Sequence, residues 1–317
     1  MQLVGVLSGL TAASIWGAMY VVSDVLLKTI PPFTLLAMRL FLGVVSLAAT
    51  GAIARRLFPG SRGSALHARW ALTRPQLTAL MITGVIGYGI SLGFQFVGTS
   101  LSTAANGALI TSATPAFVAL FAVWLLRESL TVFRIAALAL ATVGVFVVVF
   151  DTDSIRLGAD VLWGNLALFA AAITWGLYSV LVKHASSQGV STLAISVLTP
   201  VGGLISILPL TFFELSSAWE RVARAMTDPK IILGVLFLGI VSTAIAMYLW
   251  NKAFELLDAT AAALMFFAQP VVGALLSAWL LGEILGVKFF AGGGLILLGV
   301  LLVSLPANAR AYVKTSS

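Results

Sequence analysis

The sequence predicts an all-α polytopic membrane protein, with ten transmembrane helices arranged as two inverted five-helix repeats around a central cavity. Its composition, ten apolar segments and an internal duplication lead to this prediction. Hydrophobic residues make up 60% of the 317 residues and charged residues 9%, and the mean hydropathy is +1.09. Soluble domains are roughly 45–50% apolar and about 25% charged. So few charges exclude a water-soluble fold.

Ten segments are apolar enough to cross a bilayer, which takes about 20 residues each. They lie at 3–24, 33–54, 76–98, 103–126, 133–150, 161–182, 191–213, 231–250, 259–281 and 288–305. The short connections between them, such as 99–102, indicate antiparallel neighbours. The first segment has no positive n-region and no clear cleavage site, so we expect a retained helix rather than a signal peptide.

The duplication relates residues 104–148 to residues 259–303, which are identical at 18 of 45 positions without a gap. The shared residues include types that seldom match by chance at an offset of 155: Pro115/Pro270, Trp124/Trp279, Glu128/Glu283 and Gly144/Gly299. Nearer each start, Trp16 corresponds to Trp175. Each repeat has five spans, and an odd number places the second copy upside down in the membrane, an arrangement found repeatedly in transporters.

The repeats divide the chain into three parts. The first repeat is expected at 1–150, an external linker at 151–160, and the second repeat with a cytoplasmic C-terminal tail at 161–317. The linker has three aspartates and one arginine, and its net charge of −2 suits an external position.

The distribution of Lys and Arg predicts the orientation. The loops on the side of the N-terminus hold 11 of them and the opposite side holds 6. We therefore expect both termini in the cytoplasm and the protein in the cytoplasmic membrane. The net charge of +7 then reflects basic loops rather than nucleic-acid binding. The basic stretch 55–75 is expected to anchor the topology at anionic lipid, with a partner or lipid site as the alternative.

One segment on the outer side, 217–226, is predicted to form a separate interfacial helix. Ser217 and Glu220 have the spacing of a capping box. Its apolar face would consist of Trp219, Val222, Ala223 and Met226. A surface helix and a gate or lid are the two interpretations.

Several motifs together resemble the EamA-type branch of the drug/metabolite transporter superfamily. They are "SIWGAMYVVSDVLLKTIPPFTLLAMRLFLG" (14–43), "STAANGALITSATPAFVALFAVWLLRESLTV" (102–132), "TWGLYSVLVK" and "ATAAALMFFAQPVVGALLSAWLLGEILGV". The resemblance covers nearly the whole chain. It implies a ten-helix, basket-like carrier in which the fifth and tenth helices are peripheral, and many members of the family export amino acids or other metabolites. Arg39 matches the family's arginine in helix two, but 195–203 in the second repeat has no counterpart.

Arg39 is the only charged residue clearly inside a span. Charged groups at membrane depth are costly and usually functional. Arg39 is interpreted either as the partner of a substrate carboxylate or outer gate, or as a structural residue that pairs with Asp24 or snorkels to the interface. No Asp or Glu lies near the centre of a span. We therefore expect uniport, exchange or a proton site near an interface rather than a central carboxylate relay.

Polar and aromatic side chains at membrane depth are the candidates for a substrate site. Trp16 and Tyr20 share one helix face, and Trp175 and Tyr178 share another. Packing or an interfacial aromatic belt is the alternative for each residue. The candidate cavity residues are Trp16, Tyr20, Arg39, Tyr88, Gln95, Asn106, Trp175, Tyr178, Tyr248 and Gln269.

The repeated prolines and glutamates receive different interpretations. Pro115 and Pro270 lie near mid-span, where a proline removes a helical hydrogen bond, so they are candidate hinges, with static kinks as the alternative. Glu128 and Glu283 end their helices, and with Asp24 they are expected to be structural, with proton coupling as the alternative.

These features predict a secondary transporter that exports a small organic metabolite, most plausibly an amino acid, by alternating access. An uptake carrier for a nucleoside, vitamin or quaternary amine is the alternative, and a channel is the alternative of a different class. The chain has no cysteine and two histidines, and no metal-ligand spacing, nucleophile–base pair or phosphate loop, so we expect neither an enzyme nor a cofactor or metal site. The expected partners are a small-molecule substrate and the lipid bilayer, without nucleic acid, for a monomer or homodimer.

Overall fold

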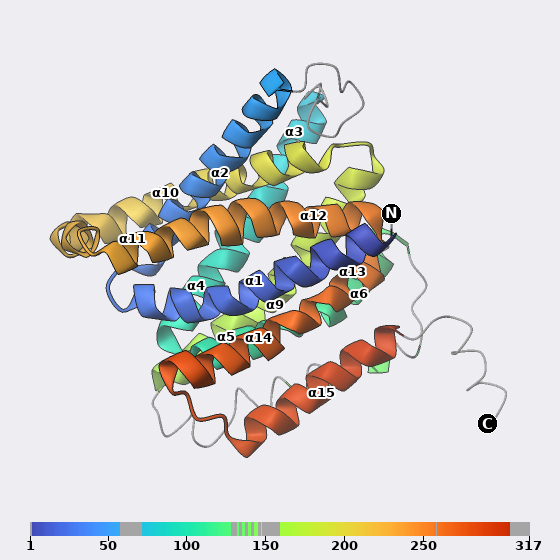
Figure 1. The fold of residues 1–317 in the computed structure, drawn as a ribbon. Helices are drawn as coiled ribbons and strands as arrows, with labels where there is room; N and C mark the ends of the chain where they lie inside the picture. The colour runs from blue at the N-terminus through green and yellow to red at the C-terminus, as the bar shows by residue number, and fades with distance from the viewer. Residues whose placement is uncertain are drawn as a thin grey trace.

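The computed structural model describes residues 2–57, 72–127, 159–257 and 259–304, with scattered residues between 132 and 147. Within these residues the chain is almost entirely helical, and seven helices are long and apolar enough to cross a membrane (Figure 1). Nine of the ten predicted spans correspond to one helix or to a run of consecutive helical segments. The tenth, 133–150, lies mostly outside the described residues. The prediction of an all-helical polytopic membrane protein is confirmed.

The first repeat contributes the helices that open the chain. These are α1 (Gln2–Leu27), α2 (Pro32–Leu57), the run α3 (Arg74–Gly84), η2 (Val85–Ser91) and α4 (Leu92–Leu101), and the pair α5 (Ala104–Thr111) and α6 (Thr114–Leu125).

The second repeat has the corresponding helices. These are α9 (Ala159–Ser187), α10 (Thr192–Ala225), the run α11 (Pro229–Leu236), η3 (Phe237–Ile245) and α12 (Ala246–Leu256), the run α13 (Ala259–Leu264), η4 (Met265–Phe267), α14 (Ala268–Leu276) and η5 (Ser277–Leu281), and finally α15 (Val287–Ser304).

Both repeats interrupt their helices at corresponding places. The third helix of each repeat passes through a π-helical stretch, η2 in the first and η3 in the second. The fourth helix of each is interrupted just before its proline, by a turn at 112–113 and by the 3₁₀ segment η4. Short π and 3₁₀ stretches inside long helices often mark functional sites or hinges. The duplication thus extends from the sequence to the irregularities of the backbone.

The two repeats interlock rather than form separate domains. Helix α1 packs against α12 and α14, α2 against α10 and η3, and α9 against α4 and α6. In Figure 1, α1 lies between α12 and α14. At one crossing a Cβ added to Gly17 would lie 2.6 Å from the carbonyl oxygen of Gln269, so only glycine allows this approach. The centre of the bundle is consequently lined by both repeats.

Charged side chains cap helices at both ends of the bundle. At the end that holds Leu27, Glu214 accepts hydrogen bonds from the backbone N–H of Phe33 (3.1 Å) and Thr34 (2.8 Å) at the start of α2. At the end that holds Gln2, the Lys183 Nζ donates to the carbonyl oxygens of Phe254 (3.0 Å) and Leu257 (2.7 Å). Helix termini leave such groups without intrahelical partners, and charges of these signs complement the helix dipole.

The prediction of a separate helix at 217–226 is wrong, because α10 continues without a break to Ala225. Ser217 donates from its hydroxyl to the Glu214 carbonyl oxygen within the helix instead of capping a new one. The buried face consists of Ala218, Val222 and Ala225, while Trp219 is exposed. Capping-box spacing also occurs inside helices, and no glycine or proline lies between Pro209 and Trp219 to end this one.

Candidate functional site

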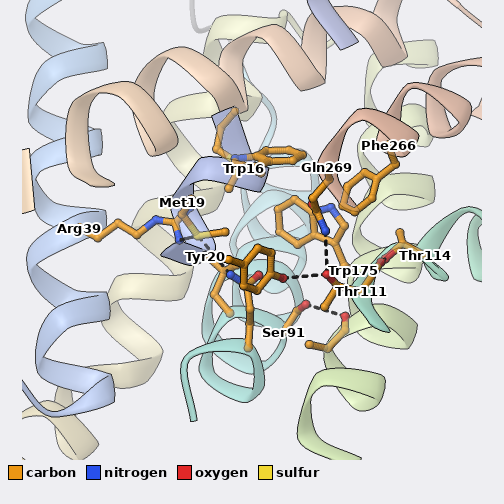
Figure 2. Close-up of a pocket in the computed structure, with 14 residues that line it drawn as sticks. Trp16, Met19, Tyr20, Arg39, Ser91, Thr111, Thr114, Trp175, Phe266 and Gln269 are labelled. Carbon is orange, nitrogen blue, oxygen red and sulfur yellow. Dashed lines mark hydrogen bonds between the residues drawn. The ribbon is translucent and has the colours of Figure 1, made fainter. Parts of the chain in front are cut away.

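A small cavity lies at the centre of the bundle, between the two repeats (Figure 2). Its volume is about 20 Å³, enough for one water molecule but not for an organic molecule. An organic molecule could enter only if the surrounding helices moved. The lining residues are Trp16, Met19, Tyr20, Arg39, Ser91, Leu92, Gln95, Thr111, Thr114, Ala171, Trp175, Met247, Phe266 and Gln269.

Arg39 reaches this cavity from α2 and is completely buried. Its Nε donates to the Thr243 hydroxyl at 2.7 Å and its Nη2 to the Ser242 hydroxyl at 3.2 Å. The guanidinium carbon also lies 5.5 Å from the centre of the Phe96 ring. Within the described part of the chain, no carboxylate pairs with Arg39. A buried cation held only by neutral groups is costly and favours the arrival of an anion.

The expected ion pair between Arg39 and Asp24 is wrong. Asp24 instead pairs with Lys28, one helical turn further along α1, with 3.0 Å between Nζ and Oδ2. Residues four apart on a helix are neighbours on its surface, so this local pair needs no contact between helices. Asp24 therefore forms its ion pair with Lys28, and no described carboxylate compensates the positive charge of Arg39.

Two strong donors converge on a weak acceptor beside Arg39. The Arg39 Nη1 donates to the Met19 sulfur at 3.1 Å, and the Gln95 Nε2 donates to the same sulfur at 3.3 Å. A thioether accepts hydrogen bonds only weakly. An oxyanion in place of the sulfur would accept both bonds more strongly. Sequence reasoning missed Met19, although it lies between Trp16 and Tyr20, both of which were candidates.

A second polar cluster joins the broken helices of the two repeats. The Gln269 Nε2 donates to the Thr111 hydroxyl at 2.7 Å and to the Ala108 carbonyl oxygen at 3.1 Å. The Thr111 hydroxyl also bonds to the Tyr20 hydroxyl at 2.8 Å. Gln269 thus satisfies a carbonyl group near the break in the first repeat. The hydrogen bonds of Thr111 with Gln269 and Tyr20 are visible at the centre of Figure 2.

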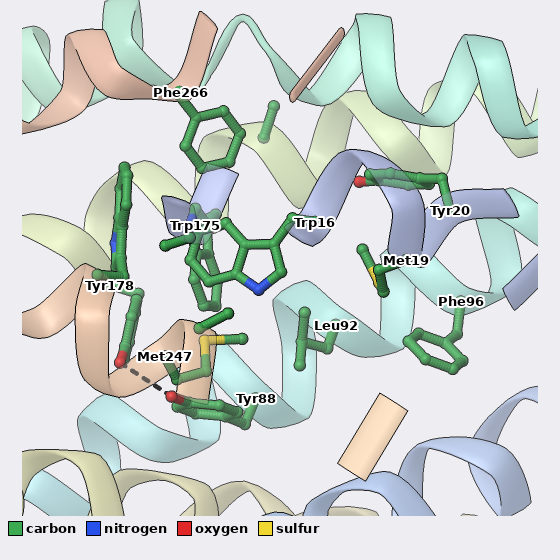
Figure 3. Packing of buried hydrophobic residues seen from close by; sticks show 14 of the residues in the cluster. Trp16, Met19, Tyr20, Tyr88, Leu92, Phe96, Trp175, Tyr178, Met247 and Phe266 are labelled. Carbon is green, nitrogen blue, oxygen red and sulfur yellow. Dashed lines mark hydrogen bonds between the residues drawn. The ribbon is translucent and has the colours of Figure 1, made fainter. Parts of the chain in front are cut away.

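Aromatic side chains form the opposite wall of the cavity (Figure 3). The Trp16 ring lies 5.7 Å from that of Trp175, 5.2 Å from that of Trp250 and 5.7 Å from that of Phe266, measured between centroids. The Trp16 Nε1 donates to the Ser242 carbonyl oxygen at 3.0 Å. The buried Nε1 of Trp175, however, has no hydrogen-bond partner among the residues that the structure describes.

Tyr88 and Tyr178 lie behind this wall and do not line the cavity. Their hydroxyls lie 3.2 Å apart, and Tyr178 also donates to the Asn251 side chain at 3.3 Å. The Asn251 amide in turn donates to the Ser196 hydroxyl at 2.9 Å. This network fills the bundle between the cavity and the Gln2 end.

Two further candidates lie away from the cavity. Asn106 follows the start of α5 at the Leu27 end, where its amide donates to the Ser102 hydroxyl at 3.3 Å. Tyr248 packs on a separate small cluster on the flank of the bundle. Helix rotation points Tyr248 away from the cavity, whereas Asn106 lies too near the end of the bundle to reach it.

The structure places six of the ten candidates on the cavity: Trp16, Tyr20, Arg39, Gln95, Trp175 and Gln269. The candidate list did not include several other lining residues, namely Met19, Ser91, Leu92, Thr111, Thr114, Ala171, Met247 and Phe266. A usable signal existed for Thr114, because the 155-residue offset relates it to Gln269, which was a candidate.

The two prolines directly follow the helix breaks. Pro115 is the second residue of α6 and Pro270 the third of α14. The Thr114 hydroxyl donates to the Thr111 carbonyl oxygen at 2.7 Å across the first break. Motion at these sites stays a prediction.

Glu283 caps a neighbouring helix. Its carboxylate accepts from the backbone N–H of Ala104 at 3.0 Å and of Ala105 at 3.1 Å, at the start of α5. Partial burial raises the pKa of Glu283, while these two hydrogen bonds lower it to a smaller extent and the nearby Asp24 adds to the rise. Glu128, its counterpart, lies outside the described residues.

Among the residues that the structure describes, no group of three or more His, Cys, Asp or Glu side chains could hold a metal ion.

The geometry defines a polytopic membrane protein with an internal two-fold repeat and a closed central site. A model of the EamA-like transporter family matches residues 3–150 and again residues 162–305. The chain therefore belongs to the EamA-like transporter family, and its relatives are transporters rather than enzymes.

Several relatives match over most of their length. An uncharacterized transporter of Bacillus subtilis, YetK, is 26% identical over 91% of this chain and 83% of its own. A protein of Escherichia coli named a probable amino-acid metabolite efflux pump is 25% identical over 99% of this chain and 98% of its own. A crystal structure with 23% identity superposes with a TM-score of 0.66 over 95% of this chain and 98% of the other, which shows the shared fold.

Proposed function

We propose that the protein is a secondary transporter of the cytoplasmic membrane that exports a small organic metabolite with a carboxylate group, such as an amino acid or a related acid. The observation that carries this proposal is Arg39, which lines the central cavity and is buried without a carboxylate partner among the described residues. Export is supported by the relatives named probable amino-acid metabolite efflux pumps. In this proposal both termini lie in the cytoplasm, as the basic loops predict.

The closed cavity supports transport by alternating access rather than through a channel. The bundle is filled on the Leu27 side by the contacts among Tyr20, Thr111 and Gln269, and on the Gln2 side by the network of Tyr88 and Tyr178. Opening one side at a time would expose Arg39 to each compartment in turn. The paired helix breaks before Pro115 and Pro270 are the places where the helices would bend.

A cationic cargo is disfavoured by the same observation. A quaternary amine in the cavity would meet the positive charge of Arg39, and the described lining residues include no carboxylate to offset it. The carboxylate and quaternary-amine proposals therefore predict opposite effects when Arg39 loses its charge.

The test is a flux panel with purified protein in proteoliposomes, covering amino acids, their deaminated acids, vitamins and quaternary amines, with and without a pH gradient. We expect saturable flux of carboxylates, and a loss of about 100-fold in Arg39→Gln, because removing one member of a buried charge pair costs about 2–5 kcal/mol. Arg74→Gln, which changes an exposed arginine at the start of α3, is the matched control. Saturable flux of quaternary amines but not of carboxylates would overturn the proposal.

A further inference from the structure

The charges around the cavity distinguish between kinds of carboxylate. An amino acid carries an ammonium group beside its carboxylate, and that group needs acceptors in a site of low dielectric constant. No acidic side chain is among the described residues that line the cavity, and four of the described acidic side chains are engaged elsewhere: Asp24 by Lys28, Glu214 by α2, Glu255 by Lys252, and Glu283 by α5. A zwitterion would thus leave the positive charge of Arg39 uncompensated in the occupied site.

The neutral groups of the cavity offer little to an ammonium. The hydroxyls of Ser91, Thr111 and Thr114 donate to backbone carbonyl oxygens at 2.9, 2.6 and 2.7 Å. Only the remaining lone pairs of their oxygens are left as weak, neutral acceptors.

The aromatic faces that would attract a cation are largely covered by other rings. Trp16 has three aromatic neighbours, and Trp175 stacks on Tyr178 with 4.5 Å between centroids. Cation–π attraction requires the cation to lie over an open ring face. The aromatic wall therefore fits an apolar part of the cargo better than a charged one.

Three donors of the cavity, in contrast, lack a strong acceptor. Arg39 and Gln95 both donate to the Met19 sulfur, and the buried indole N–H of Trp175 has no partner. A buried donor without a partner carries the full desolvation cost of that group. A ligand that carries a carboxylate with a second oxygen on the neighbouring carbon offers one acceptor group for Arg39 and Gln95 and another for Trp175.

We infer that the preferred cargo is a monoanionic 2-hydroxy or 2-oxo carboxylate with an apolar side chain, rather than a zwitterionic amino acid. The carboxylate replaces the Met19 sulfur as the acceptor for Arg39 and Gln95, and the oxygen on C2 accepts from Trp175. The monoanion compensates the charge of Arg39, and no positive group is left in the site. This inference rests on the proposed function, since it assigns a narrower substrate class to the same site.

The experiment compares pairs of molecules that differ only on C2. Phenylalanine is compared with phenyllactate, and leucine with 2-hydroxy-4-methylpentanoate. Affinities are measured by equilibrium binding to the purified full chain, and uptake is measured in proteoliposomes against protein-free liposomes. We expect each hydroxy acid to bind at least about tenfold more tightly than its amino acid, since an added hydrogen bond and a compensated charge each contribute on the order of that factor.

Trp175→Phe provides the residue-level test, with the preference for hydroxy acid over amino acid as the readout. We expect that ratio to fall toward one, because phenylalanine keeps a ring but has no N–H. Trp250→Phe is the matched control, because Trp250 also has a buried, unpartnered Nε1 but does not line the cavity. An unchanged ratio in Trp175→Phe, or an equal fall in both variants, would overturn the assignment of Trp175.

The outcomes separate the two proposals. Amino acids that bind as tightly as their hydroxy acids, in an Arg39-dependent manner, would overturn this inference and leave the proposed carboxylate transporter intact. If none of the four molecules shows saturable binding or flux, both this inference and the proposed function are overturned. Because the wild-type comparison needs no substitution, the test does not depend on variants that fold.

Discussion

The two repeats have the same irregularities in their backbones, but they contribute different side chains to the cavity. Both bend through a π-helical stretch in the third helix and break the fourth helix before a proline, in one register. At the cavity, however, corresponding positions differ. Gln95 corresponds to Trp250 and Thr111 to Phe266, and Arg39 has no counterpart in 195–203.

This difference indicates how a duplicated fold acquires a directional site. A two-fold backbone provides two equivalent ways of bending, which alternating access needs. If the side chains were also duplicated, the site would have two identical halves. Here the first repeat supplies the charged Arg39, and the described lining residues of the second repeat include no charged side chain, so a cargo with one charged and one apolar end has a single orientation.

Among changes at corresponding positions of the two repeats, the largest expected effect comes from replacing the polar Gln95 by an apolar side chain. Gln95→Leu should weaken carboxylate binding by about tenfold or more, because a hydrogen bond to a charged group contributes about 1.5–3 kcal/mol. Binding isotherms of wild type and variant provide the measurement. Trp250→Phe, at the corresponding position of the second repeat, should stay within about twofold, on the expectation that a similar-sized aromatic keeps the packing. Equal losses in both variants would remove the asymmetry between the repeats.

The second prediction concerns the shared hinges. Pro115→Ala and Pro270→Ala should each slow turnover by up to about tenfold and change binding by less than about twofold, since each restores a backbone N–H and a stiffer helix. Their similar effects would reflect the duplicated backbone. Turnover and affinity are measured separately by flux and by binding. Pro209→Ala, inside α10 and exposed, is the control. Unchanged turnover in both hinge variants would identify static kinks.

Changing Glu283 should have a smaller effect, on the stability of the folded protein and on how that stability depends on pH. Its folded-state pKa is raised, chiefly by burial, so the folded protein binds this proton more tightly than the unfolded chain does. Stability should therefore fall as pH rises through the interval between the two pKa values, and level off above it. Glu283→Gln should remove this slope, and Glu283→Ala should additionally lose about 1 kcal/mol of capping at α5. Thermal unfolding in detergent across pH provides the measurement, and an identical slope in Glu283→Gln would contradict the assignment.

The smallest effects are expected where the fourth spans end. Arg127 and Gly282 correspond at the 155-residue offset, and both adopt positive φ, at 55° and 68°. A Cβ added at Gly282 would meet nothing within 4 Å, so Gly282→Ala should cost about 1 kcal/mol through the backbone alone. Arg127→Gly should stabilise by up to a similar amount, about 1 kcal/mol. Shifts of the same sign in thermal unfolding would contradict this comparison.

Hydrophobicity and duplication are properties of the linear chain, and they predicted the membrane class, the positions of nine spans and the repeat. A bilayer requires every span to satisfy its backbone internally, so a long apolar segment is almost always a helix. The prediction of a separate helix at 217–226 was wrong because it also used only local sequence. Capping-box spacing is compatible with a helix start, but it does not show that the preceding helix ends.

Only the tertiary structure decided which side chains face the cavity. Asn106 and Tyr248 are polar side chains on predicted spans, but neither lines the cavity. Met19, an apolar side chain that was not a candidate, receives two strong hydrogen-bond donors. Arg39 was identified from the sequence as the one charge within a span, whereas only the structure shows that no described carboxylate pairs with it. Depth follows from counting residues along a helix, but the partners of a buried group depend on helix rotation and crossing, which arise from contacts between residues far apart in the chain.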